Sequence, residues 1–291
     1  MDYVKPQEVV KSMVAAGCAK LQLPPSQLIL RGMLAGAYLG VATSMAVTAA
    51  VETGLWMVGA LLFPFGLCLA VLLGTEIITG SFAPIPCAAM QNPAERSPTR
   101  VVANWAWVFL GNLLGSMLYA VLLGIVVTTG GDAPLSAVGA KLVAIAEAKT
   151  TYYAHHGAAG FLTVFTKAVL CNWMVSLAVV FAFSTTSLVG KMVAIWGPTV
   201  LFFMQGFEHA VVNMFVIPAG ILLGANVTFA DWWLWNQIPV TLGNLVGGMV
   251  LTGGAIYWAH RAVVPASGSA APVAIPQAGA ASERSGYSPS F

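Results

Sequence analysis

Two short segments, Gly74–Gly80 (GTEIITG) and Gly206–Phe215 (GFEHAVVNMF), are the most informative about the fold. Each places a glutamate two residues after its first glycine, inside a long apolar run. An ionisable residue in such a run is costly in a bilayer and marks a functional position by default. The stretch after the first glutamate, Thr79–Ala89 (TGSFAPIPCAA), is rich in glycine and proline and is not expected to continue one helix. We therefore expect apolar helices that are interrupted within the membrane.

The composition of the whole chain indicates a membrane protein. Of its 291 residues, 58% are hydrophobic and 8% are charged, and the mean hydropathy is +0.84. Soluble domains carry about 25% charged residues, so a water-soluble globular protein is excluded. The formal net charge of +2 is too small for a nucleic-acid-binding protein. No CxxC pair occurs, so we expect no disulfide framework, no metal site and no cofactor at the four cysteines, Cys18, Cys68, Cys87 and Cys171.

Six apolar segments are long enough to cross a bilayer as helices, which takes about 20 residues each. They lie at residues 29–51, 56–78, 105–129, 161–183, 192–223 and 239–260. The fifth segment is too long for one span and contains Gly197-Pro198, Gly206 and Pro218. The chain is therefore predicted to be an all-α, multi-pass membrane protein of six transmembrane helices, with the second and fifth helices broken.

The distribution of lysine and arginine predicts the orientation, because loops rich in these residues stay in the cytoplasm. Nine basic residues fall on one side of the six-span arrangement, and two, Lys141 and Lys149, fall on the other. Both termini are therefore expected in the cytoplasm, with the protein in the plasma (inner) membrane. Residues 1–264 are predicted to form a single transmembrane domain, in which residues 1–28 make an interfacial helix or, as the alternative, a simple helical lead-in to the first span. Residues 265–291, rich in Pro, Ala, Ser and Gly, are predicted to be a disordered cytoplasmic tail.

An internal repeat favours a transport function. Leu110–Gly115 (LGNLLG) and Leu242–Gly247 (LGNLVG) are separated by the same distance along the chain as Gly74 and Gly206. This register aligns the two interrupted segments and places the first span on the fourth, so that the repeats cover about 29–129 and 161–260. With three spans in each repeat, the halves insert with opposite orientation. Inverted repeats are typical of transport proteins, whose substrate site lies near the midplane between broken helices.

Four ionisable residues lie within the predicted spans: Glu76, Lys167, Glu208 and His209. Lys167 lies near one end of its span, so either its ammonium group reaches the membrane surface or it pairs with Glu76 or Glu208. The two glutamates occupy equivalent repeat positions, which favours a shared structural role such as capping the amino end of a half-helix. Direct contact between these glutamates and a substrate is the alternative.

His209 is the strongest candidate for a functional residue. It lies beside the second interruption, with Asn213 one turn later, whereas the equivalent position in the first repeat is Ile77. A lone histidine makes no metal site. A small anion crosses hydrocarbon only with preorganised hydrogen-bond donors or with a proton that neutralises it. Imidazole exchanges protons near physiological pH, and Thr79 at the other interruption supplies a matching hydroxyl.

Five stretches of the chain resemble those of the formate/nitrite transporter family. Besides the two segments quoted first, they are Ala148–Thr151 (AKTT), Lys167–Ala178 (KAVLCNWMVSLA) and Pro239–Gly248 (PVTLGNLVGG). The resemblance runs from about Lys5 to His260. It implies an aquaporin-like protomer, a homopentamer with one pore in each protomer, and passage of small monovalent anions such as formate or nitrite. With the central histidine, this passage is expected to be linked to protons.

By motif position, the resemblance makes His209 the central pore histidine and places Thr79 in the loop that breaks the second helix. Three asparagines match polar positions on the side of the pore: Asn172, Asn213 and Asn244. Five residues match apolar positions at the pore constrictions: Phe63, Leu67, Ile78, Val175 and Phe202. Ile78 is a departure, since family members often carry Phe there, so this constriction is expected to be wider or softer.

Two alternatives remain open on the sequence alone. Within the same family, the substrate is hydrosulfide, lactate or bicarbonate instead of formate or nitrite. An aquaporin-type channel for water or small neutral solutes also has six spans in inverted halves, and Asn92-Pro93-Ala94 matches its motif. The second copy of that motif is missing, because the equivalent position in the second repeat reads Gly224-Ala225-Asn226, and we expect the first copy to be a turn. An enzyme is not expected, since neither HExxH nor GxSxG occurs.

Overall fold

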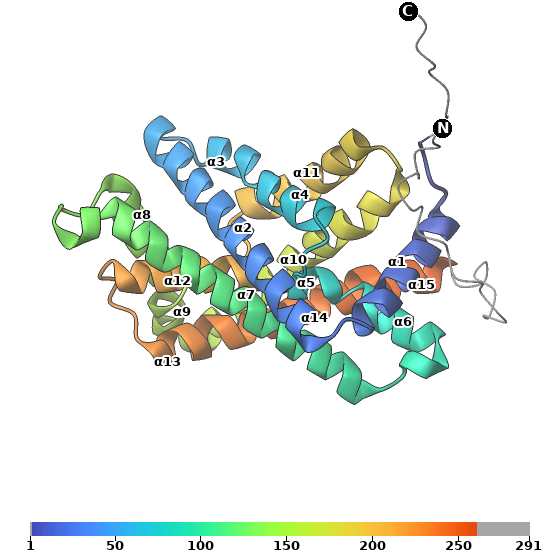
Figure 1. The fold of residues 1–291 in the computed structure, drawn as a ribbon. Coiled ribbons are helices and arrows are strands. Elements are labelled where there is room, and N and C mark those ends of the chain that lie inside the picture. Colours follow the sequence, from blue (N-terminus) through green and yellow to red (C-terminus); the bar gives the residue numbers. More distant parts are fainter. Residues whose placement is uncertain (1, 261–291) are drawn as a thin grey trace, which may run out of the picture.

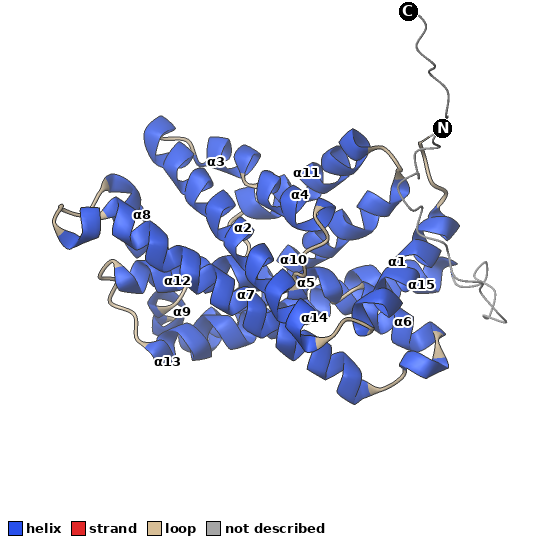
Figure 2. Ribbon diagram, in the orientation of Figure 1, coloured by secondary structure: helices blue, strands red, loops and turns tan. Residues whose placement is uncertain are grey.

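The computed structural model describes residues 2–260, so the predicted tail at residues 265–291 lies outside the described part of the chain. Within residues 2–260 the regular structure is helical (Figure 2), apart from an isolated bridge between Tyr3 and Thr185. The predicted all-α class is therefore confirmed.

Four helical stretches of the described chain are long and apolar enough to cross a membrane. They are Pro25–Thr53, Pro98–Val127, Gly157–Ser184 and Phe229–His260. These stretches correspond to the predicted first, third, fourth and sixth spans. Shorter apolar helical stretches cover the predicted second and fifth spans, at Trp56–Leu72, Leu188–Met204 and Ala210–Leu222.

Figure 1 shows the arrangement of the helices. In chain order, the α-helices are α1 (Pro6–Leu21), α2 (Pro25–Thr53), α3 (Trp56–Leu62), α4 (Pro64–Leu72), α5 (Ile78–Ser81), α6 (Pro84–Gln91), α7 (Pro98–Val127), α8 (Ala137–Ala148), α9 (Thr151–His155), α10 (Gly157–Phe181), α11 (Leu188–Met204), α12 (Ala210–Leu222), α13 (Phe229–Trp232), α14 (Ile238–Val246) and α15 (Ala255–His260). Short 3-10 turns lie at Pro93–Glu95 (η1), Thr129–Gly131 (η2) and Ala182–Ser184 (η3), and π-helical segments lie at Trp233–Gln237 (η4) and Gly247–Gly254 (η5). The tripeptide Asn92-Pro93-Ala94 is a turn, as expected, since Asn92 caps η1.

The segments Gly74–Gly80 and Gly206–Phe215 contain no helix around their first glycine. Residues 73–77 separate α4 from α5, and residues 205–209 separate α11 from α12. Gly74 and Gly206 have φ values of +64° and +63°, a conformation that glycine adopts without the steric cost of a side chain. The backbone therefore leaves the helix at the same point of both segments.

After each of these glycines, the chain closes onto the preceding helix in the same way. The amide of Thr75 donates to the carbonyl of Ala70 at 3.0 Å, and the amide of Phe207 donates to the carbonyl of Phe202 at 3.1 Å. Bonds that span five residues in this way satisfy carbonyl groups at the end of a helix. Each interruption is thus an ordered helix end and does not leave these groups unpaired.

Glycines of the LGNL motifs allow close packing of the long helices. A Cβ atom at Gly111 on α7 would meet the carbonyl oxygen of Ile29 on α2, and one at Gly243 on α14 would meet that of Phe165 on α10. Small residues at such contacts let two helix backbones approach each other closely. The motifs therefore join α7 to α2 and α14 to α10.

Helix α1 buries its apolar face against protein. Val10 and Met13 are fully buried and pack with Cys87 of α6 and with Val180 of α10. Helices α1 and α15 lie side by side at one end of the molecule (Figure 1). The expected helix at the start of the chain is therefore present, and α6 and α10 cover its apolar face.

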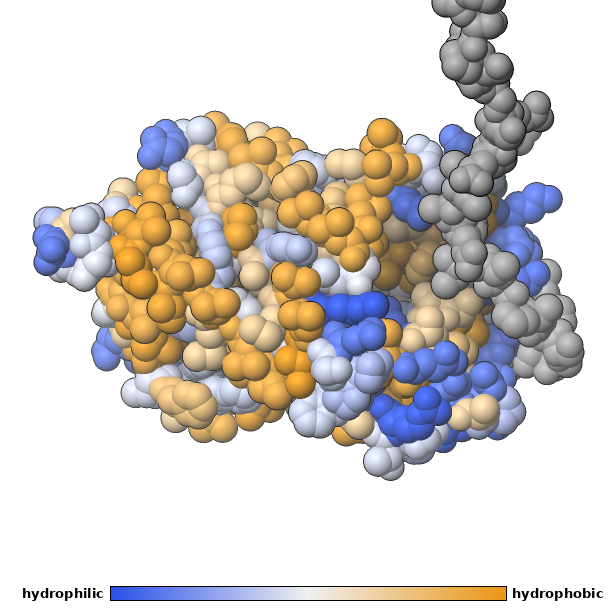
Figure 3. Space-filling model, viewed as in Figure 1, coloured by the Kyte–Doolittle hydropathy of each residue, from blue (hydrophilic) through white to orange (hydrophobic). Residues whose placement is uncertain are grey.

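The surface view shows where the described chain is apolar. Apolar residues cover most of the face drawn in Figure 3, and hydrophilic residues gather near α6 and the loop that follows it. Along α7, large apolar side chains are exposed at Leu114, Leu118, Leu122 and Ile125. An apolar exterior is compatible with lipid, whereas the buried polar groups need partners within the protein.

Candidate functional site

Thr79 and His209 meet between the two interruptions. Thr79 is the second residue of α5, and His209 directly precedes α12, so each lies at the start of the helix that follows an interruption. The Oγ1 atom of Thr79 lies 2.9 Å from Nε2 of His209, and both residues are buried. The structure therefore brings together the two side chains that the sequence analysis assigned to opposite interruptions.

The hydrogen bonds of His209 define where its proton lies. Its Nδ1 atom accepts a hydrogen bond from the amide of Val212 at 3.2 Å, and His209 thereby caps α12. A ring nitrogen that accepts from an amide carries no hydrogen, so a neutral His209 has its proton on Nε2. Nε2 then donates to the hydroxyl of Thr79. The site thus contains an N–H donor of fixed orientation, and the hydroxyl hydrogen of Thr79 is directed elsewhere.

Asn112 of α7 holds the first interruption in place. Its Oδ1 atom accepts from the amide of Ile78 at 3.0 Å. Its Nδ2 atom donates to the carbonyls of Gly32 and Glu76 at 2.9 and 2.8 Å. One buried side chain therefore joins α2, the interruption and the start of α5.

Asn244 of α14 makes the same three bonds at the second interruption. It accepts from the amide of Ala210 at 2.9 Å and donates to the carbonyls of Ala168 and Glu208 at 2.8 and 2.9 Å. Asn112 is absent from the predicted site residues, although its place in the LGNL motif, opposite Asn244, is a signal that identifies it.

The other two predicted asparagines are also bonded to the protein. Nδ2 of Asn172 donates to the carbonyl of Thr79 at 3.1 Å. Nδ2 of Asn213 donates to Oε2 of Glu208 and to Oδ1 of Asn236, both at 2.8 Å. Within the described chain, the Oδ1 atoms of Asn172 and Asn213 have no hydrogen-bond partner. These asparagines support the site, and their contact with a passing anion stays a prediction.

Of the two roles open for Lys167, pairing with a glutamate is wrong. Glu208 pairs with Lys149 at 2.8 Å, and Glu76 pairs with Lys20 at 2.5 Å. Lys149 directly follows α8 and Lys20 lies in the last turn of α1, so each cation comes from a segment that precedes a long helix. Both glutamates are almost fully buried, and buried carboxylates need such partners.

The predicted capping role of the glutamates is also wrong. The residue that caps α12 is His209, and α5 follows Ile77, which makes no side-chain cap. The reason is that lysine ammonium groups bind the two carboxylates, and such charge-assisted bonds are stronger than a bond to a neutral amide.

Tyr153 connects the ion pair of Glu208 to Lys167. From α9, its hydroxyl donates to Oε1 of Glu208 at 2.8 Å. Burial, and then the nearby carboxylate, raise the pKa of Tyr153, so its hydroxyl keeps its proton. The ammonium group of Lys167 lies 3.4 Å from the tyrosine hydroxyl and 5.8 Å from the centre of its ring. Lys149 and Tyr153 are further site residues that the sequence analysis missed.

The predicted constriction residues all lie in the buried core: Phe63, Leu67, Ile78, Val175 and Phe202. The ring of Phe63 meets that of Phe202 edge-on, with centroids 5.8 Å apart. Phe202 in turn stacks on the imidazole of His209 at 5.7 Å. The structure therefore places two of the five beside or near the histidine, and Leu67, Ile78 and Val175 in the surrounding core.

A cavity of about 200 Å³ reaches His209. Its walls include Phe202 and three charged residues, Lys149, Lys167 and Glu208. With His209 neutral, these three side chains sum to one positive charge. In a buried site such a charge is weakly screened and attracts an anion.

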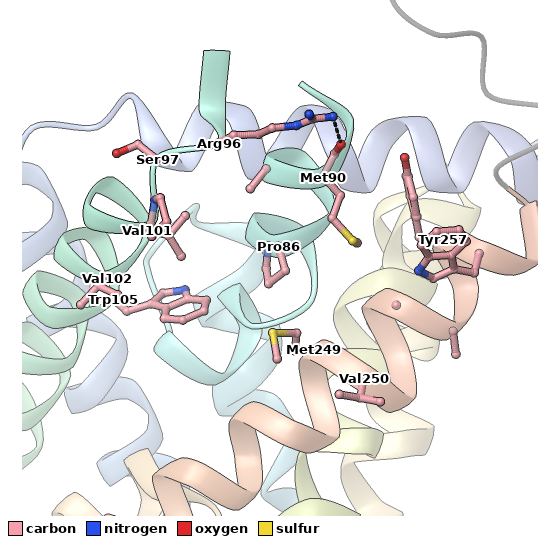
Figure 4. A pocket seen from close by; sticks show the side chains of 15 residues that line it. Pro86, Met90, Arg96, Ser97, Val101, Val102, Trp105, Met249, Val250 and Tyr257 are labelled. Carbon is pink, nitrogen blue, oxygen red and sulfur yellow. Dashed lines mark hydrogen bonds between the residues drawn. The ribbon is translucent and has the colours of Figure 1, made fainter. Parts of the chain in front are cut away.

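A larger hollow lies apart from this site, between α6, α7 and η5–α15 (Figure 4). Its volume is about 1060 Å³, and Trp105, Met249 and Tyr257 contribute to its mainly apolar lining. At its edge, Arg96 donates to the carbonyl of Met90 at 3.0 Å (Figure 4). It is lined by none of the predicted site residues, so we do not assign it to the functional site.

Sequence comparison with known proteins covers nearly the whole chain. The profile of the family described as Formate/nitrite transporter matches residues 7–259. A probable formate transporter of Methanothermobacter thermautotrophicus is 36% identical over 273 residues, which cover 88% of this chain and 96% of that protein. A formate channel of Bacillus thuringiensis is 34% identical over 269 residues, which cover 90% and 97%, respectively.

Solved structures agree with the sequence comparison. An FNT family ion channel superimposes with a TM-score of 0.74 at 26% identity, covering 87% of this chain and 98% of that one. A pentameric formate channel with formate bound superimposes with a TM-score of 0.66 at 29% identity, covering 82% and 98%.

Proposed function

Because this chain belongs to the formate/nitrite transporter family, whose members are transport proteins and not enzymes, we propose that it conducts formate or nitrite through a pore in each protomer. Its apolar helices make it an integral membrane protein. The observation that carries the proposal is the buried pair of Thr79 and His209, which adjoins a cavity with one excess positive charge. A small monovalent anion fits the charge and the donors of this site.

The proposal includes six spans in two inverted repeats, with the second and fifth spans broken. In its support, Asn112 and Asn244 make equivalent hydrogen bonds in the two halves. The first span departs slightly from the register of the repeat. In that register Gly32 corresponds to Val164, whereas the acceptor equivalent to Gly32 is Ala168, about one turn of helix later. A shift of one turn leaves the same helix face toward the asparagine.

Lys167 is proposed to attract the anion into the cavity. Lys149 is neutralised by Glu208, whereas Lys167 makes no salt bridge to an acidic residue among those that the structure describes. The excess charge therefore belongs to Lys167. An anion that loses hydration water in the cavity gains this attraction in exchange, which lowers the cost of its desolvation.

His209 is proposed to exchange a proton with the anion. The neutral ring donates from Nε2, so an arriving anion competes with the Thr79 hydroxyl for this hydrogen bond. An imidazolium ring also carries hydrogen on Nδ1, where the amide of Val212 donates. Proton uptake therefore requires this bond to break, and the charge of the anion compensates for its loss. Transfer of the proton to the anion releases the neutral acid and restores the neutral ring.

The assembly is proposed to be a homopentamer in the plasma membrane, with both termini in the cytoplasm. The pentameric formate channel that shares the fold supports the assembly, and the nine-to-two distribution of basic residues supports the orientation. Native mass spectrometry should show five copies, and a stable monomer or dimer would contradict this part of the proposal.

The test of the proposed function is anion uptake by the purified protein in liposomes, with the internal pH recorded at the same time. We expect uptake of formate or nitrite that is accompanied by internal acidification. Faster uptake of hydrosulfide, lactate or bicarbonate would favour the alternative substrates. Osmotic swelling without anion flux would favour a channel for water or neutral solutes.

A further inference from the structure

A row of four aromatic side chains ends at His209. Trp56 stacks on Phe203, with ring centroids 5.3 Å apart and planes 9° from parallel. Phe203 stacks on Phe63 at 3.9 Å and 13°. Phe63 meets Phe202 edge-on, Phe203 also meets Phe202 edge-on at 6.3 Å, and Phe202 stacks on the imidazole. Phe63 and Phe202 are predicted constriction residues. Trp56 and Phe203 lie outside the five stretches that resemble the family and are not among the predicted site residues.

The first two rings of this row are anchored to the backbone. Nε1 of Trp56 donates to the carbonyl of Phe203 at 3.3 Å. That carbonyl lies in the last turn of α11 and also accepts from the amide of Gly206 at 3.1 Å. The interruption therefore fixes the backbone of Phe203, while its ring lies between Trp56 and Phe63. Both Trp56 and Phe203 line the cavity that reaches His209.

Phe63 lies at the junction of two helices, where its amide donates to the carbonyl of Gly59 at 3.0 Å and its carbonyl accepts from the amide of Gly66 at 3.1 Å. It separates α3 from α4, and α4 begins with Pro64. Because proline has no amide hydrogen, a helical hydrogen bond is missing at this point. The orientation of the buried Phe63 ring depends on its neighbours, which are Phe203 on one face and Phe202 at the edge.

We infer that Trp56 and Phe203 are positioning residues that hold the ring of Phe63 against Phe202 and thereby limit the size of anion that reaches His209. This inference rests on the proposed function, since the limit matters only for a pore that passes the histidine. Stacked and edge-on ring pairs contribute favourable energy beyond simple burial. Removal of the middle ring leaves space on one face of Phe63, so the Phe63 ring turns and larger anions pass.

The test compares formate, acetate and lactate uptake by the full-length protein in liposomes. Phe203→Leu keeps an apolar side chain and removes the middle ring. We expect the ratio of lactate to formate uptake to rise about tenfold, the effect that the loss of the ring pairs made by Phe203 supports. Trp56→Phe keeps a ring and removes one hydrogen bond, so we expect a rise of about threefold. If Phe203→Leu does not fold, the uptake ratio of Trp56→Phe alone tests the inference.

Two controls separate positioning from a direct effect on the cavity wall. Phe65→Leu is the matched substitution on α4, where the side chain is exposed, and it should leave the ratio unchanged. The double variant Phe63→Leu/Phe203→Leu should show the same ratio as Phe63→Leu alone, because both changes act on one ring.

The outcomes distinguish this inference from the proposed function. An unchanged ratio in Trp56→Phe and in any folded Phe203→Leu protein overturns the inference while formate uptake persists. A further tenfold rise in the double variant also overturns it, since Phe203 would then act without Phe63. Wild-type protein that takes up none of the three anions overturns the proposed function and the inference together.

Discussion

Asn244→Ala should be among the most destabilising substitutions in the chain. The side chain accepts from the amide of Ala210 and donates to the carbonyls of Ala168 and Glu208, and all three bonds are 2.8–2.9 Å long and buried. Each contributes about 1 kcal/mol net, and a buried group left without a partner costs about 1–3 kcal/mol. Because some of the three groups find new partners, we expect the free energy of unfolding to fall by about 3–5 kcal/mol.

The assay is thermal unfolding in detergent, followed by tryptophan fluorescence. For Asn244→Ala we expect the melting temperature to fall by roughly 10 °C. Asn104→Ala is the matched control, because Asn104 is also buried in a long helix but makes one bond, from Nδ2 to the carbonyl of Lys20 at 2.8 Å. It should lower the melting temperature by roughly 3 °C. Equal shifts in the two variants would show that the three hydrogen bonds of Asn244 do not stabilise the interruption.

Three further predictions concern the ion pair, the tyrosine and the orientation. Lys149→Met leaves the Glu208 carboxylate buried without its cation and should lower the free energy of unfolding by about 3–5 kcal/mol. The double variant Lys149→Met/Glu208→Gln should recover most of the lost stability, as measured by chemical unfolding. Because the pKa of Tyr153 is raised in the folded protein, its protonated hydroxyl contributes fully to stability below about pH 10, the pKa of an unfolded tyrosine. This contribution to the free energy of unfolding is lost as the pH rises further above that value. Stability of the wild type and Tyr153→Phe should therefore converge at high pH; a constant difference would contradict this. An impermeant thiol reagent on intact cells should label a single cysteine at Ala140 and spare one at Ser97, and the reverse pattern would exclude the proposed orientation.

The sequence contained strong signals for the interruptions and for the histidine. A glycine followed by a glutamate in an apolar run is unusual, and its recurrence in the same register as the LGNL motifs predicted two related sites. Thr79 and His209 each follow one of these glutamates, and the structure brings them into contact. Local composition and spacing were sufficient here, because both residues lie next to the backbone feature that positions them.

The partners of the charged residues could not be predicted in the same way. Lys167 lies inside a predicted span, so pairing with Glu76 or Glu208 was one of its two open roles, whereas Lys149 lies in the segment between two helices. The structure pairs Glu208 with Lys149 because α8 and α9 carry that segment back to the interruption. A contact of this kind depends on how helices fold back, and neither periodicity nor local composition reports it.

No pattern in the sequence identified Trp56 and Phe203 as positioning residues. Aromatic side chains are common in apolar helices, so Trp56 and Phe203 resemble ordinary lipid-facing or core residues in the sequence. Their importance follows from three-dimensional facts: the ring of Phe203 lies between two others, and its carbonyl accepts the indole hydrogen of Trp56.

His209 is proposed to link the passage of the anion to a proton. The most direct measurement is uptake of radiolabelled formate into liposomes that contain the wild-type protein or His209→Asn, from about pH 5 to about pH 8. Asparagine keeps a polar side chain at the end of α12 but takes up no proton. We predict uptake by the wild type that increases as the pH falls, and at most a slow, pH-independent leak through His209→Asn. The same pH dependence in both proteins would contradict this role and make His209 a structural partner of Thr79 only.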